Sequence, residues 1–220
     1  MTDLLRQSEA SAALYDLLAL GFSYPHQEFY GTLTSGSFSA DAAANIALLG
    51  NPAPLHGAHE QLVVGIRVVA GTGACDTLES QYLELFELNR NQAPLHLNAH
   101  LYAAGQPDPV TMYRQLQDMY CAFGLELKAD PQIEAPDHLT LQLEFLAYLY
   151  RLLGSMLTTR EQDAAARVRE GIESFLGELA WIHRFVELLQ DRSAHPFYVP
   201  LAGLLQTLLV HATEQPAARC

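Results

Sequence analysis

Glu134-Ala135-Pro136-Asp137-His138 leads directly into the apolar run Leu139-Thr140-Leu141-Gln142-Leu143-Glu144-Phe145-Leu146. Apolar residues continue to Leu153, so this segment is apolar nearly all round and predicts the central buried helix of the fold. Asp137 is expected to cap the helix by accepting a backbone N–H bond. His138 lies beside it and carries a charge that changes near neutral pH.

The composition favours a folded, acidic protein that does not bind nucleic acid. Half of the 220 residues are hydrophobic, which is enough for a sizeable core. The chain carries 25 acidic and 12 basic residues, for a formal net charge of −13. Phosphate contacts need Lys and Arg, so this balance disfavours nucleic-acid binding. The same charge would attract a basic peptide or protein patch, although an acid excess also serves solubility alone.

The cysteines and the N-terminal residues indicate a cytoplasmic protein. Cys75, Cys121 and Cys220 are far apart and odd in number, which fits a reducing compartment better than a disulfide framework. Residues 1–9 contain early acids and no long apolar run, so no secretory signal is expected. No uncharged apolar stretch reaches the ~20 residues that a membrane span needs.

Apolar residues at helical spacing dominate the chain, with no alternating strand pattern and no internal repeat. The sequence therefore predicts an all-α, single-domain helical bundle over residues 1–213, followed by a flexible tail over 214–220. Gly and Pro mark the expected helix ends. The predicted breaks lie at Gly21 with Pro25, Gly31, Gly36, Gly71 with Gly73, Gly124 and Gly177.

Four segments carry further local signals. Residues 51–57 hold two prolines and a glycine, which suits a loop before a helix from about residue 59. Asp108-Pro109 gives an N-cap followed by Pro at the first helical position. Thr159-Arg160-Glu161-Gln162 has capping-box spacing and predicts a helix start. Residues 89–107 form the longest non-periodic stretch, and such stretches are either functional or simple connectors.

The first candidate site is an apolar stripe with acidic neighbours. Tyr82, Leu85 and Phe86 fall on one helical face, and Glu84 and Glu87 lie beside it. An apolar groove with acidic rims would suit a peptide that has both arginines and a hydrophobic run. The same pattern also describes an amphipathic helix packed on the core.

The second candidate is a histidine pair. If the segment were helical, His96 and His100 would lie on one face and could share a metal. No His-Glu-x-x-His motif or Cys cluster accompanies them, so we expect no metal site, and the imidazoles would instead form hydrogen bonds across the loop or line a groove. An all-α metalloprotein or enzyme that uses His96, His100 and nearby carboxylates is one alternative function. No phosphate-binding loop, dinucleotide motif or nucleophile elbow is present.

The third candidate is the corner at Glu134, Pro136, Asp137 and His138. A plain helix cap would explain Asp137 without any further role. Its carboxylate could also accept hydrogen bonds from a guanidinium group, and such charge-assisted bonds are strong and directional. The corner is therefore a candidate peptide-binding element.

These elements together resemble the TorD/DmsD/NarJ family of redox enzyme maturation chaperones. Tyr82-Leu83-Glu84-Leu85-Phe86 is similar to the family's aromatic-x-x-Leu-Phe element. Residues 134–138 with Leu143-Glu144-Phe145-Leu146 resemble its Glu-x-Pro-Asp-His motif and following helix, and His195-Pro196-Phe197-Tyr198 resembles the element that opens its last helix. Order and spacing agree over most of the chain.

The segment Leu95-His96-Leu97-Asn98-Ala99-His100 replaces the Pro-Pro-Trp-like sequence of the TorD/DmsD branch. In this respect the chain looks more like the NarJ branch and the dedicated chaperones of related molybdoenzymes. Those enzymes include nitrate, selenate and chlorate reductases and dimethylsulfide and ethylbenzene dehydrogenases. The departure leaves open which enzyme is the client, that is, the protein the chaperone serves.

The resemblance implies a cytoplasmic chaperone and not an enzyme. Its partner would be the N-terminal segment of a molybdoenzyme catalytic subunit, often a twin-arginine signal peptide. It would hold the apoprotein until the molybdenum cofactor, molybdopterin guanine dinucleotide, is inserted, and it would keep no cofactor itself. Cofactor-synthesis proteins are further candidate partners. A helical interaction module without a redox client is the remaining alternative.

Overall fold

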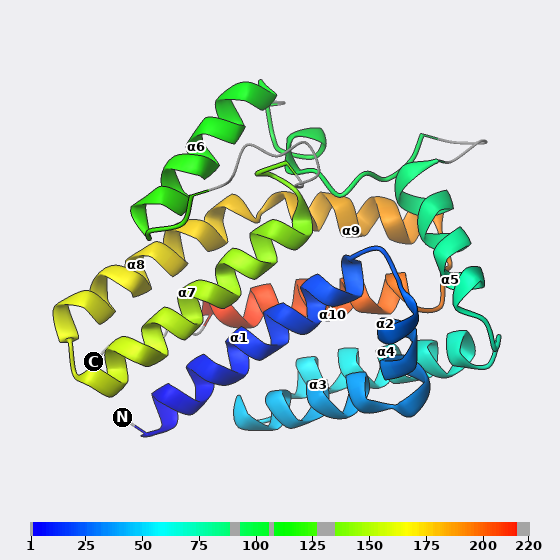
Figure 1. Cartoon of the computed structure of the whole chain (residues 1–220), viewed down its shortest axis with the longest axis horizontal. Coiled ribbons are helices and arrows are strands. Elements are labelled where there is room, and N and C mark those ends of the chain that lie inside the picture. The colour runs from blue at the N-terminus through cyan, green and yellow to red at the C-terminus, as the bar shows by residue number, and fades with distance from the viewer. Residues whose placement is uncertain (1, 89–92, 106–107, 127–134, 215–220) are drawn as a thin grey trace.

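Two helices that are far apart in the sequence, α1 (Thr2–Phe22) and α7 (Leu139–Thr159), run side by side through the centre of the protein (Figure 1). The computed structural model describes residues 2–88, 93–105, 108–126 and 135–214. Side chains on nearly every face of α7 are buried, which confirms the predicted central helix. At the contact, Tyr15 stacks on Tyr150 with ring centroids 5.7 Å apart.

The other helices surround this pair and share one continuous apolar core. Helix α8 packs on α7, α3 packs on α1, and α10 packs on both α4 and α9. The described residues contain no strand, and an isolated bridge joins Asn98 to His138. The remaining elements are α2 (Gln27–Ser35), α3 (Ser37–Leu48), α4 (Ala53–Ala70), α5 (Cys75–Tyr82), the π-helix η1 (Leu83–Glu87), the 3-10 turn η2 (Ala99–Leu101), α6 (Pro109–Ala122), α8 (Gln162–Glu178), α9 (Trp181–Arg192) and α10 (Tyr198–Glu214).

The all-α prediction is confirmed, but several predicted helix ends are wrong. Helix α4 begins at Ala53 and not near residue 59, because a first helical turn has no intrahelical partners for its N–H groups and so accepts proline. Gly31 lies inside α2 and does not end it. The break predicted at Gly177 is confirmed, since α8 ends at Glu178 and α9 begins at Trp181. Gly36 does separate α2 from α3, with a left-handed φ of 81°.

Two of the three capping predictions, those at Asp108 and Thr159, have opposite outcomes. The Asp108 side chain caps α6 as expected, accepting the Thr111 N–H at 3.0 Å. The predicted capping box at Thr159 is wrong, since Thr159 is the last residue of α7 and α8 begins at Gln162. The Thr159 hydroxyl donates backwards to the Ser155 carbonyl at 3.2 Å, so it serves the end of α7. Residues 215–220 of the predicted tail lie outside the described residues.

Helix α10 is attached to the bundle through His195 and Pro196. His195 Nδ1 accepts the N–H groups of Phe197 and Tyr198 at 3.1 and 3.2 Å, so the ring proton lies on Nε2 and is donated to Gln81 at 2.9 Å. Burial lowers the pKa of His195 to about 4. Within the described residues no helix is long and apolar enough to span a membrane.

Helix α4 passes so close to this attachment that only glycine fits at one position. A Cβ atom on Gly65 would lie 1.7 Å from the carbonyl oxygen of Pro196. We expect Gly65→Ala to lower the free energy of unfolding by about 3 kcal/mol or more, because backbone must move. Gly57→Ala, on the same helix with nothing within 4 Å, should raise it by about 0.5–1 kcal/mol. Urea unfolding of both variants checks this, and equal effects would contradict it.

The neutral His195 ring predicts a pH-dependent stability. The pKa of His195 is lowered on folding, so its contribution is complete above the ordinary value of 6.5 and is lost as the pH falls toward about 4. Between about pH 7 and about pH 4.5, wild type should lose on the order of 1–2 kcal/mol more unfolding free energy than His195→Asn, after allowing for solvent screening. Asn can accept the same N–H groups without titrating. Identical pH profiles from urea unfolding would refute the role of His195.

Candidate functional site

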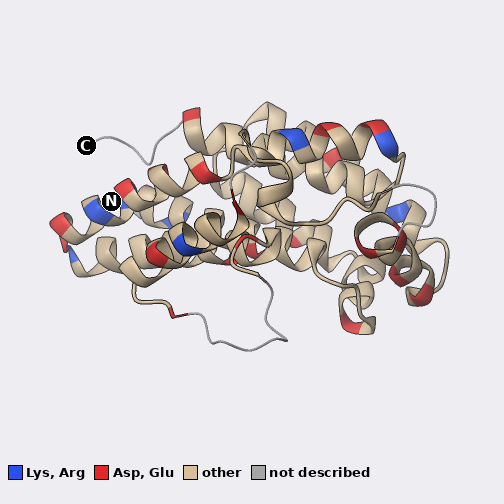
Figure 2. Cartoon of the chain, turned by 90° about the horizontal axis from the view of Figure 1, so that it is seen from above, with Lys and Arg blue, Asp and Glu red and all other residues tan. Residues whose placement is uncertain are grey.

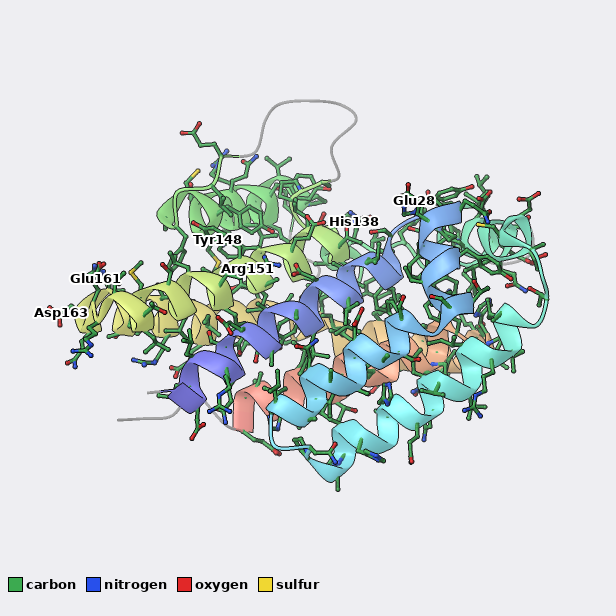
Figure 3. The ribbon with its side chains drawn as sticks, turned by 60° about the horizontal axis from the view of Figure 1, so that its bottom comes forward. Glu28, His138, Tyr148, Arg151, Glu161 and Asp163 are labelled. Carbon is green, nitrogen blue, oxygen red and sulfur yellow. The ribbon has the colours of Figure 1, made fainter. Side chains whose placement is uncertain are left out.

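A groove lies where the end of α1, the π-helix η1 and the first turns of α7 meet. It has a volume of about 580 Å³. Three of the predicted site residues line it, and they come from two of the three candidate elements: Tyr82 and Glu87 from the stripe and His138 from the corner. Figure 3 shows His138 at the first turn of α7, with Tyr148 and Arg151 farther along the same helix. The fold thus brings together residues that are far apart in the sequence.

The π-helix forms one wall of the groove. The Leu88 N–H donates to the Leu83 carbonyl at 2.7 Å, a bond that spans five residues and closes η1. Leu83 and Leu88 line the groove, and Leu88 is 70% exposed. Single π-turns inside helices are frequent at functional sites, since the extra residue redirects side chains. The π-turn therefore presents an apolar side chain to solvent beside the groove.

The predicted apolar stripe is divided between the core and the groove. Phe86 is fully buried, with its ring centroid 5.1 Å from those of Tyr82 and Tyr198. Leu85 is half-buried against the core, and Glu84 is exposed. None of these three lines the groove, so the core-packing interpretation describes Phe86 and Leu85, whereas Tyr82 contributes to both surfaces.

Carboxylates determine the electrostatics of the groove. Glu87 and Glu144 are lining residues, and no Lys or Arg is among the lining residues that the structure describes. Partial burial raises the pKa of Glu144, because its charged form is desolvated. A cation bound beside Glu144 would offset that desolvation. The groove is therefore suited to a basic group next to apolar side chains.

Asp137 holds the start of α7 in place through a fully buried carboxylate. One oxygen accepts the Asn98 side-chain amide at 3.0 Å, and the other accepts the His100 backbone N–H at 3.0 Å and the His100 ring Nδ1–H at 2.6 Å. Backbone bonds between Ala99 and Asp137 and between Leu139 and Leu97, at 3.0 and 2.7 Å, complete the connection. Asp137 thus fastens the loop before η2 to the mouth of α7.

This geometry corrects the capping prediction. His138, not Asp137, occupies the N-cap position of α7, and no side chain there bonds the helix amides. The Asp137 carboxylate turns away because the loop provides three donors for it. His138 Nδ1 lies 2.7 Å from the Thr140 hydroxyl, and the Pro136 carbonyl accepts the Tyr120 hydroxyl at 2.6 Å. Glu134 lies outside the described residues.

The two candidate histidines do not form the pair that a helix would have produced. His96 lies in an irregular segment and His100 in the 3-10 turn η2, so the helical premise was wrong. The His96 carbonyl accepts the Tyr102 hydroxyl at 2.8 Å, and the His100 ring meets Tyr113 edge-on at 6.1 Å. Within the described ranges, no group of three or more His, Cys, Asp or Glu is placed to hold a metal.

Sequence reasoning missed part of the groove. Thr140, Leu141 and Glu144 all face it from α7, and the i, i+4 spacing of Thr140 and Glu144 is a signal that could have revealed a polar stripe on an otherwise apolar helix. Tyr24 follows the end of α1, and its hydroxyl donates to Glu79 at 3.2 Å. Nothing in the sequence near Tyr24 indicates that the chain returns to this place.

The chain is similar to known proteins over nearly its whole length. A family model described as the nitrate reductase delta subunit matches residues 53–187. The dimethyl sulfide dehydrogenase assembly chaperone protein of Rhodovulum sulfidophilum is 31% identical over 212 residues, covering 94% of this chain and 78% of that protein. The selenate reductase assembly chaperone protein of Thauera selenatis is 29% identical over 210 residues, covering 93% and 90%.

The fold is also found among solved structures. One example is a crystal structure of a protein from Archaeoglobus fulgidus that was assigned as a candidate redox enzyme maturation protein, with a TM-score of 0.51 and 17% identity, covering 89% of this chain and 92% of that one. Fold and relatives together define an all-α assembly chaperone and not an enzyme. The chain belongs to the nitrate reductase delta subunit family, in which NarJ and TorD are grouped. The resemblance inferred from the sequence is confirmed.

Because the Asp137 carboxylate is buried, replacing it with an amide should destabilise the fold, whereas an exposed helix cap would tolerate the same change. Asp137→Asn should lower the free energy of unfolding by about 2–4 kcal/mol, because one amide NH₂ must then face a buried donor. Asp108→Asn, at the exposed cap of α6, should cost less than about 0.5 kcal/mol. Chemical denaturation of both variants measures the difference. A loss at Asp137 as small as that at Asp108 would disprove its fastening role.

Proposed function

We propose that this protein is the dedicated cytoplasmic chaperone of one molybdoenzyme catalytic subunit, and that its groove binds the N-terminal segment of that client. The relatives from Rhodovulum and Thauera, by their names, assemble a dimethyl sulfide dehydrogenase and a selenate reductase. A third relative, from Ideonella dechloratans, is a chlorate reductase assembly chaperone protein. This similarity supports a client that belongs to the same broad class of enzymes as the clients of these three relatives.

The observation that carries the proposal is the groove, where two carboxylates lie beside apolar side chains. A twin-arginine signal segment combines basic groups with a hydrophobic run, so its arginines complement Glu87 and Glu144 and its apolar side chains complement Leu88 and Leu141. Acidic segments far outnumber basic ones along the ribbon, in keeping with the net charge of −13 (Figure 2). Such a field speeds the approach of a basic segment.

The remaining candidate residues have supporting roles in this proposal. Asp137 and His100 position His138 by holding the loop against the start of α7. Phe86 holds η1 on the core, so that the π-turn keeps its shape. Residues 1–213 act together as one chaperone domain.

Binding would keep the apo-subunit from folding or being exported before its molybdenum cofactor is in place. Molybdopterin guanine dinucleotide enters the client and is not retained by the chaperone. Cofactor-synthesis proteins would then meet the client while the chaperone holds it. Release requires reversible binding, and an affinity on the order of micromolar suits that need.

The test is calorimetry with a synthetic peptide that copies the client's N-terminus. Glu144→Gln and Glu87→Gln should each weaken binding by about 3–10-fold, because both carboxylates line the groove and each would lose its attraction for a bound cation. Glu84→Gln, one turn away and outside the groove, should change it by less than about twofold. Raising the salt from ~0.05 to ~0.5 M should weaken wild-type binding.

Client maturation provides the second measurement. Co-expression with Glu144→Gln should lower the molybdenum content of the client, whereas co-expression with Glu84→Gln should not. Equal effects of the Glu144 and Glu84 variants would place the binding surface outside this groove. Failure of the wild-type protein to bind any N-terminal peptide of its client would refute the proposed function itself.

A further inference from the structure

A second cavity lies at the other end of the α1–α7 pair from the groove. It is enclosed by the first half of α1, the second half of α7, and α8 and α10, near the N-terminal end of α1 in Figure 1. Its volume is about 60 Å³. A single water needs about 10–15 Å³ on this measure, so the cavity has room for a ligand of about four to six non-hydrogen atoms.

Two hydrogen-bond donors in the cavity wall have no partner among the described residues. The Tyr15 hydroxyl belongs to a side chain that is 0% exposed, and the Nε of Arg169 is also buried. Buried donors without acceptors are rare in native proteins, because each loses its hydration without compensation. Burial raises the pKa of Tyr15 well above its ordinary value, so the hydroxyl keeps its proton and remains a donor.

The cavity also departs from the charge pattern of the rest of the protein. The chain has 25 acidic residues, yet no Asp or Glu lines this cavity, and Arg169 has no ion-pair partner in the described part of the chain. The other wall residues include leucines of α1, α7 and α10, among them Leu4, Leu153 and Leu208. One positive charge and two donors without partners are therefore combined with leucines, and with the polar side chains of Gln7, Ser8, Ser11 and His211, in a single small space.

We propose that this cavity binds a small monocarboxylate. Its oxygens accept hydrogen bonds from Arg169 Nε–H and the Tyr15 hydroxyl, and its short apolar chain lies against the leucines. A single negative charge matches the single guanidinium, and a charge-assisted bond of this kind is strong in a partly buried site. A dianion such as phosphate would leave one charge uncompensated beside leucine. This site is independent of the client groove, since the two share no lining residue.

The proposal is tested on the full chain at neutral pH with sodium propionate as the probe. Calorimetry should give saturable binding, and the Arg169 Nε–H resonance should shift with the same midpoint in NMR titration. Arg169→Gln should weaken binding at least about tenfold and Tyr15→Phe by about fivefold. Arg167→Gln, an exposed arginine on the same helix, should stay within about twofold of wild type.

Tyr15→Phe removes a buried hydroxyl that has no partner, so this variant should fold at least as well as wild type. It therefore tests the proposal even if Arg169→Gln does not fold. Sodium chloride at matched ionic strength and neutral n-propanol should not bind. Binding of phosphate or propanol as tightly as propionate would overturn the proposal. Propionate binding that neither Arg169→Gln nor Tyr15→Phe weakens would also overturn it. A lack of any saturable propionate binding would overturn it as well, because water alone would then satisfy the two donors.

Discussion

The buried carboxylate of Asp137 fixes the point at which the central helix begins. Two donors from His100 and one from Asn98 surround it, so the loop before η2 and the mouth of α7 cannot separate without leaving an unpaired charge in the interior. Helix α7 in turn packs on α1 and α8. The register of α7 therefore depends on this connection, and so does the direction in which Thr140 and Glu144 point.

The groove follows from that register. Because α7 starts at Leu139, the side chains of Thr140, Leu141 and Glu144 in its first turns line the groove. The π-turn supplies the opposite wall and keeps Leu88 in solvent. Rigid elements thus present carboxylates and apolar surface together, which is the combination that the proposed client segment would complement. A chaperone of this kind needs no catalytic group, only a surface complementary to an unfolded segment.

The two ends of the α1–α7 pair differ in chemistry. At the end of α1 and the start of α7, carboxylates line an open groove. At the opposite end, one arginine and one tyrosine hydroxyl face a small cavity that has leucine and uncharged polar side chains in its wall and no carboxylate. The first arrangement suits a basic partner and the second a small anion. Tyr15 and Tyr150, which stack on each other, both line the cavity, so the cavity is built on the same helix pair that carries the groove.

The helical class, the central helix and the family could all be predicted from the order of the amino acids. The apolar run after His138 is typical of a buried helix, and it forms α7. The cap at Asp108 depends only on residues next to it in the chain. Local signals failed where a competing partner lay elsewhere. Asp137 looked like a cap because Asn98 and His100 were not visible as its donors, and Thr159 looked like a helix start although it ends α7.

The groove and the cavity, in contrast, depend on contacts between helices that are distant in the chain. The sequence pattern could not tell that Phe86 is buried while Leu88 is exposed, because a π-turn changes the helical phase between them. It also could not show that Tyr24 and Glu144 share a groove, or that Tyr15 and Arg169 share a cavity. These pairs are far apart along the chain, and hydrophobic periodicity reports which face of a helix is buried but not which helix covers it.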